Sequence, residues 1–251
     1  MAVYESDKKY INKDTLTNYC NTNEHLIVTP VKGFVIELPG LDGNSCMGGN
    51  MTLGKNETGV AQELAAHGIL HAYAFPGPWS WMNKGARRLV DGIVDAIKEI
   101  YHLGENAPWM VMGGSMGGLG ALMYTCTAKT KPTACIAVCP CTDVVKSFDV
   151  ITEFPRTFIR AISDYDMPFE EGLKTLSPIE HLGEMPDIPY LIINDCADEL
   201  FPEEELDVYV EKLKEHVSNV EYDKLKGCIH GEITVDEWHK IIQFLITNLS
   251  K

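Results

Sequence analysis

Residues 109–120 read WMVMGGSMGGLG, an apolar run of strand length followed by a glycine-rich turn and a stretch of small residues at helical spacing. The turn centres on Ser115, with Gly113 and Gly117 two positions away on either side. Small residues are needed there, because a sharp turn from a strand into a helix brings two backbones close together. The stretch therefore predicts a strand, a tight turn and a helix, with Ser115 at the carboxyl edge of a sheet.

Apolar runs of strand length alternate with stretches of helical period over most of the chain, which is typical of a parallel sheet flanked by helices. Residues 142–188 are too long for a simple connection and predict a small helical, cap-like insertion within a single domain of residues 1–251. Residues 1–24 are polar, and two alternatives stay open for them: an edge strand, or a segment lying across the sheet. The predicted strands are His25–Thr29, Gly33–Leu38, Ile69–Phe75, Trp109–Gly113, Thr133–Val138, Tyr190–Asn194 and Asn219–Leu225.

The composition restricts the classes of function. With 45% hydrophobic and 23% charged residues in 251 positions, the chain is typical of a soluble globular protein. The 36 Asp and Glu exceed the 21 Lys and Arg, and the net charge of -15 repels phosphate backbones and anionic lipids. We therefore expect neither nucleic acid nor membrane as a partner. The polar start of the chain and the lack of an apolar run of about 18 residues predict a cytoplasmic location.

A serine hydroxyl is a weak nucleophile at neutral pH and needs a histidine base, which a carboxylate orients. His230 follows the last predicted strand and is the histidine expected to act on Ser115. The acid is expected after the sixth predicted strand, because open α/β sheets place their ligand sites at the carboxyl ends of strands. Asp198 is the first choice in that loop, and Asp195 and Glu199 stay open as alternatives.

Acyl transfer also needs amide donors for the oxyanion that develops on the substrate. The amide of Met116, directly after Ser115, is the first candidate. The amide of Leu41, in the loop after the second predicted strand, is the second. Trp79 and Trp81 belong to an aromatic loop after the third predicted strand and are expected to line an apolar substrate pocket.

The sequence predicts no metal site and no cofactor. Cys139 and Cys141 have no second cysteine pair at zinc spacing, and the chain contains no H-E-x-x-H motif. The eight cysteines are expected to be reduced thiols in a cytoplasmic protein. Cys196 and Cys228 each precede a candidate catalytic residue by two positions, and the sequence assigns them no role.

The order Ser115, Asp198, His230, with the motifs around it, resembles the α/β-hydrolase superfamily. The resemblance extends from about residue 31 to the C-terminus. It is carried by Gly113–Gly118, Ser177-Pro178-Ile179, Asp198–Pro202 and His230-Gly231. Within the superfamily, the chain looks most like the catalytic domain of the prolyl oligopeptidase family and its small esterase relatives, including dienelactone hydrolase-like proteins. It departs from the family's usual His-Gly in the loop before Leu41, where it has Pro39-Gly40.

The resemblance implies a serine hydrolase without a cofactor, acting on a small-molecule ester or a short peptide. A carboxylesterase for small neutral or apolar acyl esters is the first reading, and a prolyl oligopeptidase-like peptidase or aminopeptidase is the alternative. A catalytically silent binding module on the same fold is the third. The fold does not separate the first two, because ester and amide cleavage use the same triad. The physiological substrate, the oligomeric state and the mobility of the insertion stay open.

Overall fold

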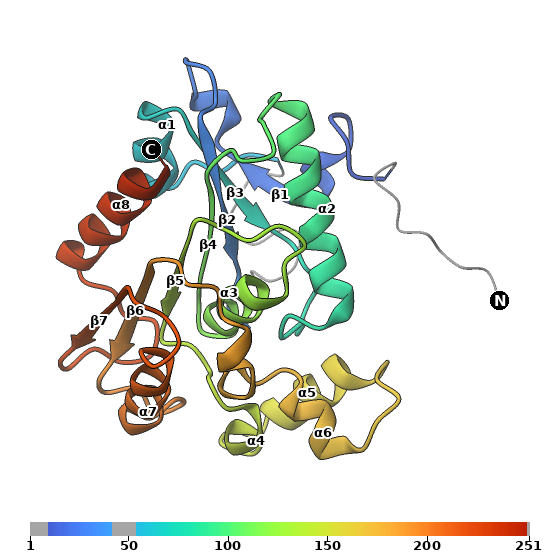
Figure 1. Ribbon diagram of the computed structural model, residues 1–251, viewed down its shortest axis with the longest axis vertical. Coiled ribbons are helices and arrows are strands. Elements are labelled where there is room, and N and C mark those ends of the chain that lie inside the picture. Colours follow the sequence, from blue (N-terminus) through green and yellow to red (C-terminus); the bar gives the residue numbers. More distant parts are fainter. Residues whose placement is uncertain (1–9, 42–53, 250–251) are drawn as a thin grey trace.

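A seven-stranded sheet forms the centre of the computed structural model, which describes residues 10–41 and 54–249 (Figure 1). The strands lie in the order β1-β3-β2-β4-β5-β6-β7. β1 runs antiparallel to β3, and all the other neighbours are parallel. The strands are β1 Cys20–Thr22, β2 Gly33–Leu38, β3 Ile69–Ala74, β4 Trp109–Gly114, β5 Ala134–Val138, β6 Tyr190–Asp195 and β7 Val220–Leu225.

Helices cover both faces of the sheet, as Figure 1 shows. Alternate side chains of β2 point to opposite faces, since Val35 packs in one apolar cluster while Phe34 and Ile36 pack in the other. Helices α1 and α8 belong to the cluster of Val35, and α2, α3 and α7 belong to that of Phe34. The α-helices are α1 Gly59–Ala66, α2 Lys84–Ile100, α3 Met116–Thr127, α4 Val144–Ser147, α5 Phe154–Ile162, α6 Phe169–Lys174, α7 Glu203–Leu213 and α8 Val235–Leu249. Short 3-10 helices are η1 Leu16–Asn18, η2 Glu24–Leu26 and η4 Pro178–Glu184.

Six of the seven predicted strands are confirmed, with ends that differ by no more than one residue. The prediction of a strand at His25–Thr29 is wrong, because η2 occupies its start and Val28 is 93% exposed. The buried side chain of Asn23 holds the preceding chain in place by donating to the Ala61 carbonyl and accepting from the His71 amide. The seventh strand is β1, an edge strand within residues 1–24, which was one of the two open alternatives.

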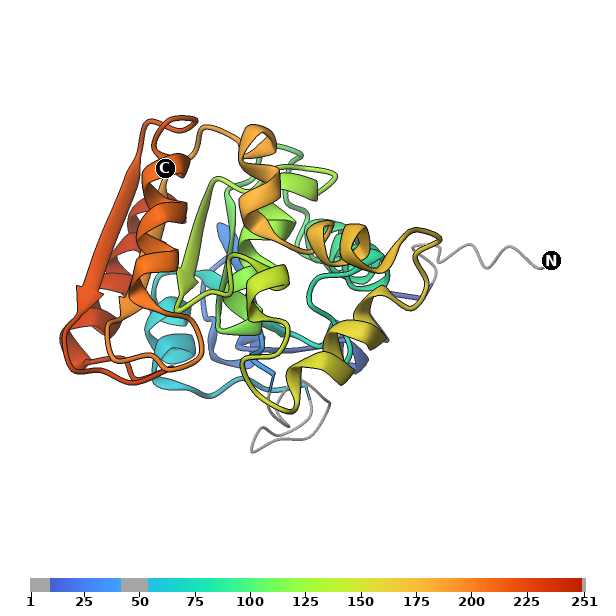
Figure 2. The same ribbon diagram turned by 90° about the horizontal axis from the view of Figure 1, so that it is seen from below.

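The segment between β5 and β6 contains α4, α5, α6 and η4. Figure 2 shows α5 and α6 on the side of the molecule opposite to β7. Trp81, from the loop after β3, fastens α5: its ring packs against Phe154 and Phe158, and its Nε1 donates to Thr157 Oγ1 at 3.0 Å. The segment between β5 and β6 therefore packs against the loop that follows β3.

None of the helices within residues 10–41 and 54–249 combines the length and the apolar character that crossing a membrane requires.

Candidate active site

Ser115 occupies a sharp turn between β4 and α3. Its backbone has φ 58° and ψ -124°, outside the regions that residues with a side chain normally adopt, and its amide donates to the Val138 carbonyl at 2.9 Å. The approach of the two elements depends on glycine: a Cβ on Gly117 would lie 2.1 Å from the Leu38 carbonyl oxygen. The glycine-rich sequence thus permits the strained turn that presents Ser115 at the end of the strand.

His230 lies in the loop between β7 and α8 and reaches Ser115. Its Nε2 is 2.8 Å from Ser115 Oγ, and its ring packs edge-on against Phe201 with 5.3 Å between centroids. The next residue, Gly231, has φ 79° and donates its amide to Asp195 Oδ2 at 2.7 Å. The contact with Phe201 and the hydrogen bond of the Gly231 amide orient the imidazole toward Ser115.

Asp198 completes the chain of hydrogen bonds. Its Oδ2 is 2.6 Å from His230 Nδ1, while its Oδ1 accepts from the amides of Leu200 at 2.7 Å and Phe201 at 3.1 Å. The side chain is only 1% exposed, so these donors replace water around the carboxylate. The tautomer of His230 that fits both contacts carries its proton on Nδ1, which donates to Asp198, and accepts from Ser115 at Nε2.

The two alternative acids occupy other positions. Asp195 is fully buried at the end of β6 and binds the Gly231 amide rather than the His230 ring. Burial raises the pKa of Asp195. Glu199 is exposed. Of the three carboxylates considered from sequence, the geometry therefore brings Asp198 to the histidine.

The two candidate oxyanion donors belong to segments that adjoin Ser115. Met116 is the first residue of α3, and amides in the first turn of a helix have no acceptor within that helix. The loop that contains Leu41 runs close to the serine, since a Cβ on Gly40 would lie 3.8 Å from Ser115 Cβ. Leu41 itself lines the same cavity as Ser115 and His230. The placement suits the role predicted for the two amides.

A cavity of about 620 Å³ opens above Ser115 and His230. Trp79 lines this cavity, but Trp81 does not: Trp81 is 0% exposed and packs against Phe154 and Phe158 of α5. Sequence alone could not separate two tryptophans two positions apart, because the turn of the loop decides which ring faces the core. The remaining apolar wall comes from Met112, Val138, Ile151, Phe154, Leu200, Ile233, Trp238 and Ile241.

Charged side chains at the cavity were not predicted. Glu37, Glu153 and Arg156 line it, and the Arg156 guanidinium lies over the Trp79 ring at 5.3 Å. Glu37 is held by His71, whose Nε2 is 2.6 Å from its carboxylate. No motif pointed to these residues, since they come from β2 and from the insertion and meet only in the folded chain.

The seven cysteines in the described ranges are free thiols, and Cys46 lies outside those ranges. The loops of Cys196 and Cys228 are joined through backbone, because the Ala197 amide donates to the Cys228 carbonyl at 2.9 Å. The Sγ of buried Cys139 lies within 4.8 Å of candidate ligand atoms of Asp198 and His230. Burial raises the pKa of Cys139, and its two neighbours already bind each other through His230 Nδ1 and Asp198 Oδ2.

No protein-family model and no curated protein matches the sequence. Puromycin hydrolase matches with a TM-score of 0.68 and 16% identity, over 89% of this chain and 34% of that protein. An acylaminoacyl peptidase from Pyrococcus horikoshii matches with a TM-score of 0.71 and 14% identity, over 89% and 38%. A truncated carbohydrate esterase from gut microbiota matches with a TM-score of 0.67 and 12% identity, over 89% and 88%.

The chain thus spans 34% of the length of puromycin hydrolase. It spans 88% of the length of the carbohydrate esterase. At these identities the likeness concerns the fold alone. The mostly parallel seven-stranded sheet flanked by helices is that of the α/β-hydrolases, a fold that the chain shares with peptidases and esterases.

Proposed function

We propose that the chain is a serine hydrolase, and specifically a carboxylesterase that cleaves small neutral or apolar acyl esters. One observation carries the proposal: an unbroken chain of hydrogen bonds runs from Ser115 Oγ through His230 to buried Asp198, at the floor of a largely apolar cavity. A nucleophile, its base and the group that orients the base are the parts that acyl transfer through an acyl-enzyme requires.

In the proposed mechanism, Ser115 Oγ attacks the ester carbonyl carbon while His230 Nε2 takes the hydroxyl proton. Asp198 stabilises the imidazolium through Nδ1 and stays ionised. The amides of Met116 and Leu41 donate to the oxyanion of the tetrahedral intermediate. His230 then gives its proton to the leaving alcohol, which leaves an acyl-Ser115 ester. Water, activated by the same histidine, hydrolyses that ester and restores the serine.

The cavity supports an apolar acyl group. Its volume of about 620 Å³ is within the range of small-molecule sites, and most of its lining side chains are aliphatic or aromatic. Burying an acyl chain against them contributes roughly 0.8 kcal/mol per methylene, so esters with longer acyl chains are expected to bind more tightly until the cavity is full.

A peptidase is the second candidate, favoured by Glu37 and Glu153. Both line the cavity, where carboxylates would suit the ammonium group of a peptide amino terminus. Glu37 is already engaged by His71, which reduces its availability for a substrate. The carboxylesterase therefore remains the first proposal.

Hydrolysis of p-nitrophenyl acetate, butyrate and octanoate, measured beside Ala- and Pro-p-nitroanilides, tests the proposal. We expect ester turnover by the wild type, its loss in Ser115→Ala, and its retention in Ser163→Ala, which removes an exposed serine of the insertion. Preferential Ser115-dependent cleavage of the anilides would replace the esterase by the peptidase. If neither class is cleaved in a Ser115-dependent way, the proposed activity is wrong and the silent binding module takes its place.

A further inference from the structure

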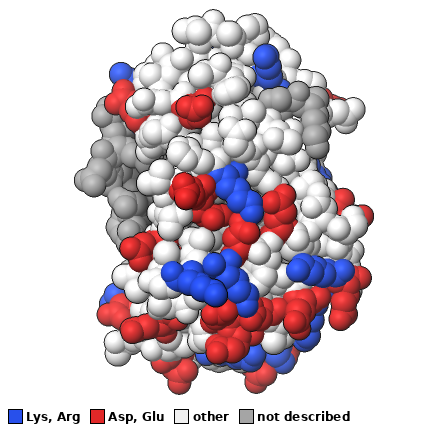
Figure 3. Space-filling model, turned by 90° about the vertical axis from the view of Figure 1, so that its left-hand side faces the viewer, with Lys and Arg blue, Asp and Glu red and all other residues white. Residues whose placement is uncertain are grey.

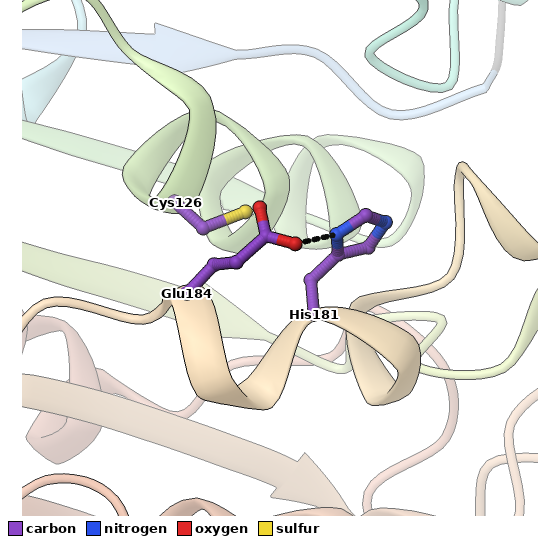
Figure 4. A group of neighbouring side chains, drawn as sticks. All are labelled: Cys126, His181 and Glu184. Atoms are coloured by element: carbon purple, nitrogen blue, oxygen red, sulfur yellow. Dashed lines mark hydrogen bonds and ion pairs between the residues drawn. The ribbon is translucent and has the colours of Figure 1, made fainter.

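Three side chains with different donor atoms meet where the end of α3 lies against η4 (Figure 4). Cys126 belongs to the last turn of α3, and His181 and Glu184 lie three residues apart in η4. Each residue offers one candidate ligand atom, and these three atoms lie within 4.8 Å of one another. They are the Cys126 Sγ, a ring nitrogen of His181 and a carboxylate oxygen of Glu184. Figure 4 shows the thiol and the imidazole on either side of the Glu184 carboxylate.

The spacing is close to that of a tetrahedral site. Ligands that bind Zn²⁺ at 2.0 to 2.3 Å lie about 3.3 to 3.7 Å from one another. His181 Nδ1 and Glu184 Oε1 are already 3.1 Å apart, so shifts of about 1 Å or less are needed to accommodate an ion. Glu184 can make such a shift, because its side chain is 60% exposed and does not pack in the core.

The donor set and its exposure indicate which ion fits. Thiolate sulfur, imidazole nitrogen and carboxylate oxygen together suit a borderline ion such as Zn²⁺, whereas Ca²⁺ and Mg²⁺ prefer oxygen ligands. Cys126 is 5% exposed and the His181 side chain 19%, so the site lies at the boundary between core and solvent. Three protein ligands leave a fourth position, which water can reach from the side of Glu184.

We propose that Cys126, His181 and Glu184 bind one divalent transition-metal ion of the Zn²⁺ type, with water as the fourth ligand. On binding, the Cys126 S–H bond breaks, its proton goes to solvent, and the sulfur electron pair forms the bond to the metal. His181 binds as the neutral imidazole, and Glu184 as the carboxylate. The two negative ligands then balance the charge of the ion, and no electron is transferred.

The proposed site is separate from the catalytic serine. Cys126 is ten residues beyond Met116, the first residue of α3 and the neighbour of Ser115, which corresponds to about 15 Å along the helix axis. A bound metal would tie the end of α3 to the segment that leads into β6. We therefore expect it to stabilise the fold without taking part in the chemistry at Ser115, and its success or failure is independent of the proposed esterase activity.

Titration of the full chain with Co²⁺ in a His230→Ala background tests the site. That substitution removes one ligand from the other described group of potential ligands, Cys139, Asp198 and His230. We expect one Co²⁺ per chain, a thiolate-to-cobalt charge-transfer band in the near ultraviolet, and the visible bands of tetrahedral Co²⁺. Cys126→Ser should abolish the charge-transfer band. Glu184→Gln and His181→Gln, which alter more exposed side chains, should weaken binding by at least about tenfold.

The control is Cys196→Ser, because Cys196 is the described cysteine that is not fully buried. This variant should keep the band. With Zn²⁺ at about 100 times its Kd, Tm should rise by about 5 to 10 °C, and the rise should be absent in Cys126→Ser. The absence of a charge-transfer band, its survival in Cys126→Ser, or its loss in Cys196→Ser would each overturn the proposal. Ester hydrolysis by Cys126→Ser is expected to match that of the wild type.

Discussion

A single residue, Gly117, allows α3 to approach the end of β2 closely. A Cβ at this position would lie 2.1 Å from the Leu38 oxygen and 2.9 Å from that of Pro39, so backbone atoms would have to move. We expect Gly117→Ala to lower the free energy of unfolding by about 1 to 3 kcal/mol or more and to displace Ser115. Denaturant unfolding and ester hydrolysis measure the two effects.

Gly59→Ala is the matched control for this substitution. Gly59 is the first residue of α1, and a Cβ there meets nothing within 4 Å. Its replacement is expected to change the free energy of unfolding by no more than about 0.5 kcal/mol and to leave hydrolysis unchanged. Equal effects of the two substitutions would show that the close approach of Gly117 to the Leu38 carbonyl does not determine the conformation of the turn at Ser115.

The choice of Asp198 over Asp195 can be tested with the same change at both positions. Asp198→Asn keeps the shape of the side chain but donates to His230 Nδ1, which favours the wrong tautomer, so we expect kcat to fall roughly 10³- to 10⁴-fold. Asp195→Asn keeps an oxygen for the Gly231 amide and should retain most of the wild-type kcat. The reverse order of effects would make Asp195 the orienting acid.

Three candidate site residues could be proposed from the sequence because each lies in the connection that follows a strand, and these connections meet at the carboxyl edge of a parallel sheet. Ser115, Asp198 and His230 have this property. Trp81 did not follow the prediction, because the backbone of its loop, with φ 43°, turns the indole into the core. Cys126 and His181 are far apart in sequence and share no motif, so only the packing of α3 against η4 brings them together.

Among the elements, α8 packs on the sheet through a face that includes a titrating carboxyl group. Glu237 is 9% exposed. Burial of its carboxyl group, a hydrogen bond with Asp223 and the negative charge of Asp223 together raise the pKa of Glu237 to about 7. Lys240, which pairs with Asp223 and Glu221, opposes the shift. The folded chain therefore holds a proton on Glu237 that the unfolded chain loses at about pH 4.5.

This linkage predicts how stability changes with pH. The contribution of protonated Glu237 is fully present below about pH 4.5 and is lost as the pH rises to about 7. Glu237→Gln mimics the protonated side chain at every pH, so its Tm relative to the wild type should increase from pH 5 to pH 8. Glu211→Gln, on the exposed face of α7, should have a similar small effect at both pH values. A Tm difference for Glu237→Gln that does not grow with pH would contradict the linkage.

The strands were easier to predict than their connections. Five strands, β2 to β6, are almost wholly buried and mainly apolar, and burial on both faces makes such runs visible in sequence. β7 is partly exposed and contains charged residues. Cys20–Thr22 is only three residues long and pairs at the edge, so it has no such pattern. His25–Thr29 has the composition of a strand, but the hydrogen bonds of Asn23 and the Pro30 that follows favour another path.

For the molecule as a whole, the charge of -15 is distributed unevenly. In Figure 3, acidic side chains gather in the lower half of the face shown, mixed with lysine and arginine, and the upper half is mostly uncharged. Two lysines on strand β7 and helix α8 are each paired with carboxylates: Lys224 with Glu203 and Asp207, and Lys240 with Glu221 and Asp223. Pairing of this kind leaves the surplus of acidic groups to set the long-range field.

The field predicts a dependence on salt that differs between substrates. Raising the ionic strength from 0.01 M to 0.15 M shortens the Debye length from about 30 Å to about 8 Å, which screens the repulsion of an anion. For an ester that carries a carboxylate, kcat/KM should therefore rise with salt. For a neutral ester of the same length it should stay constant. A fall with salt for the anionic ester would mean that Arg156, at the cavity, outweighs the net charge.

Covalent labelling tests the central claim most directly, because the account depends on a nucleophilic Ser115. The full chain is treated with a fluorophosphonate, and the adduct is located by peptide mass spectrometry. The account predicts one adduct per chain, on Ser115, formed much more slowly in His230→Ala and absent in Ser115→Ala. A fold that binds substrate without activating its serine would give no adduct, and that result, or an adduct on a different residue, would contradict the account.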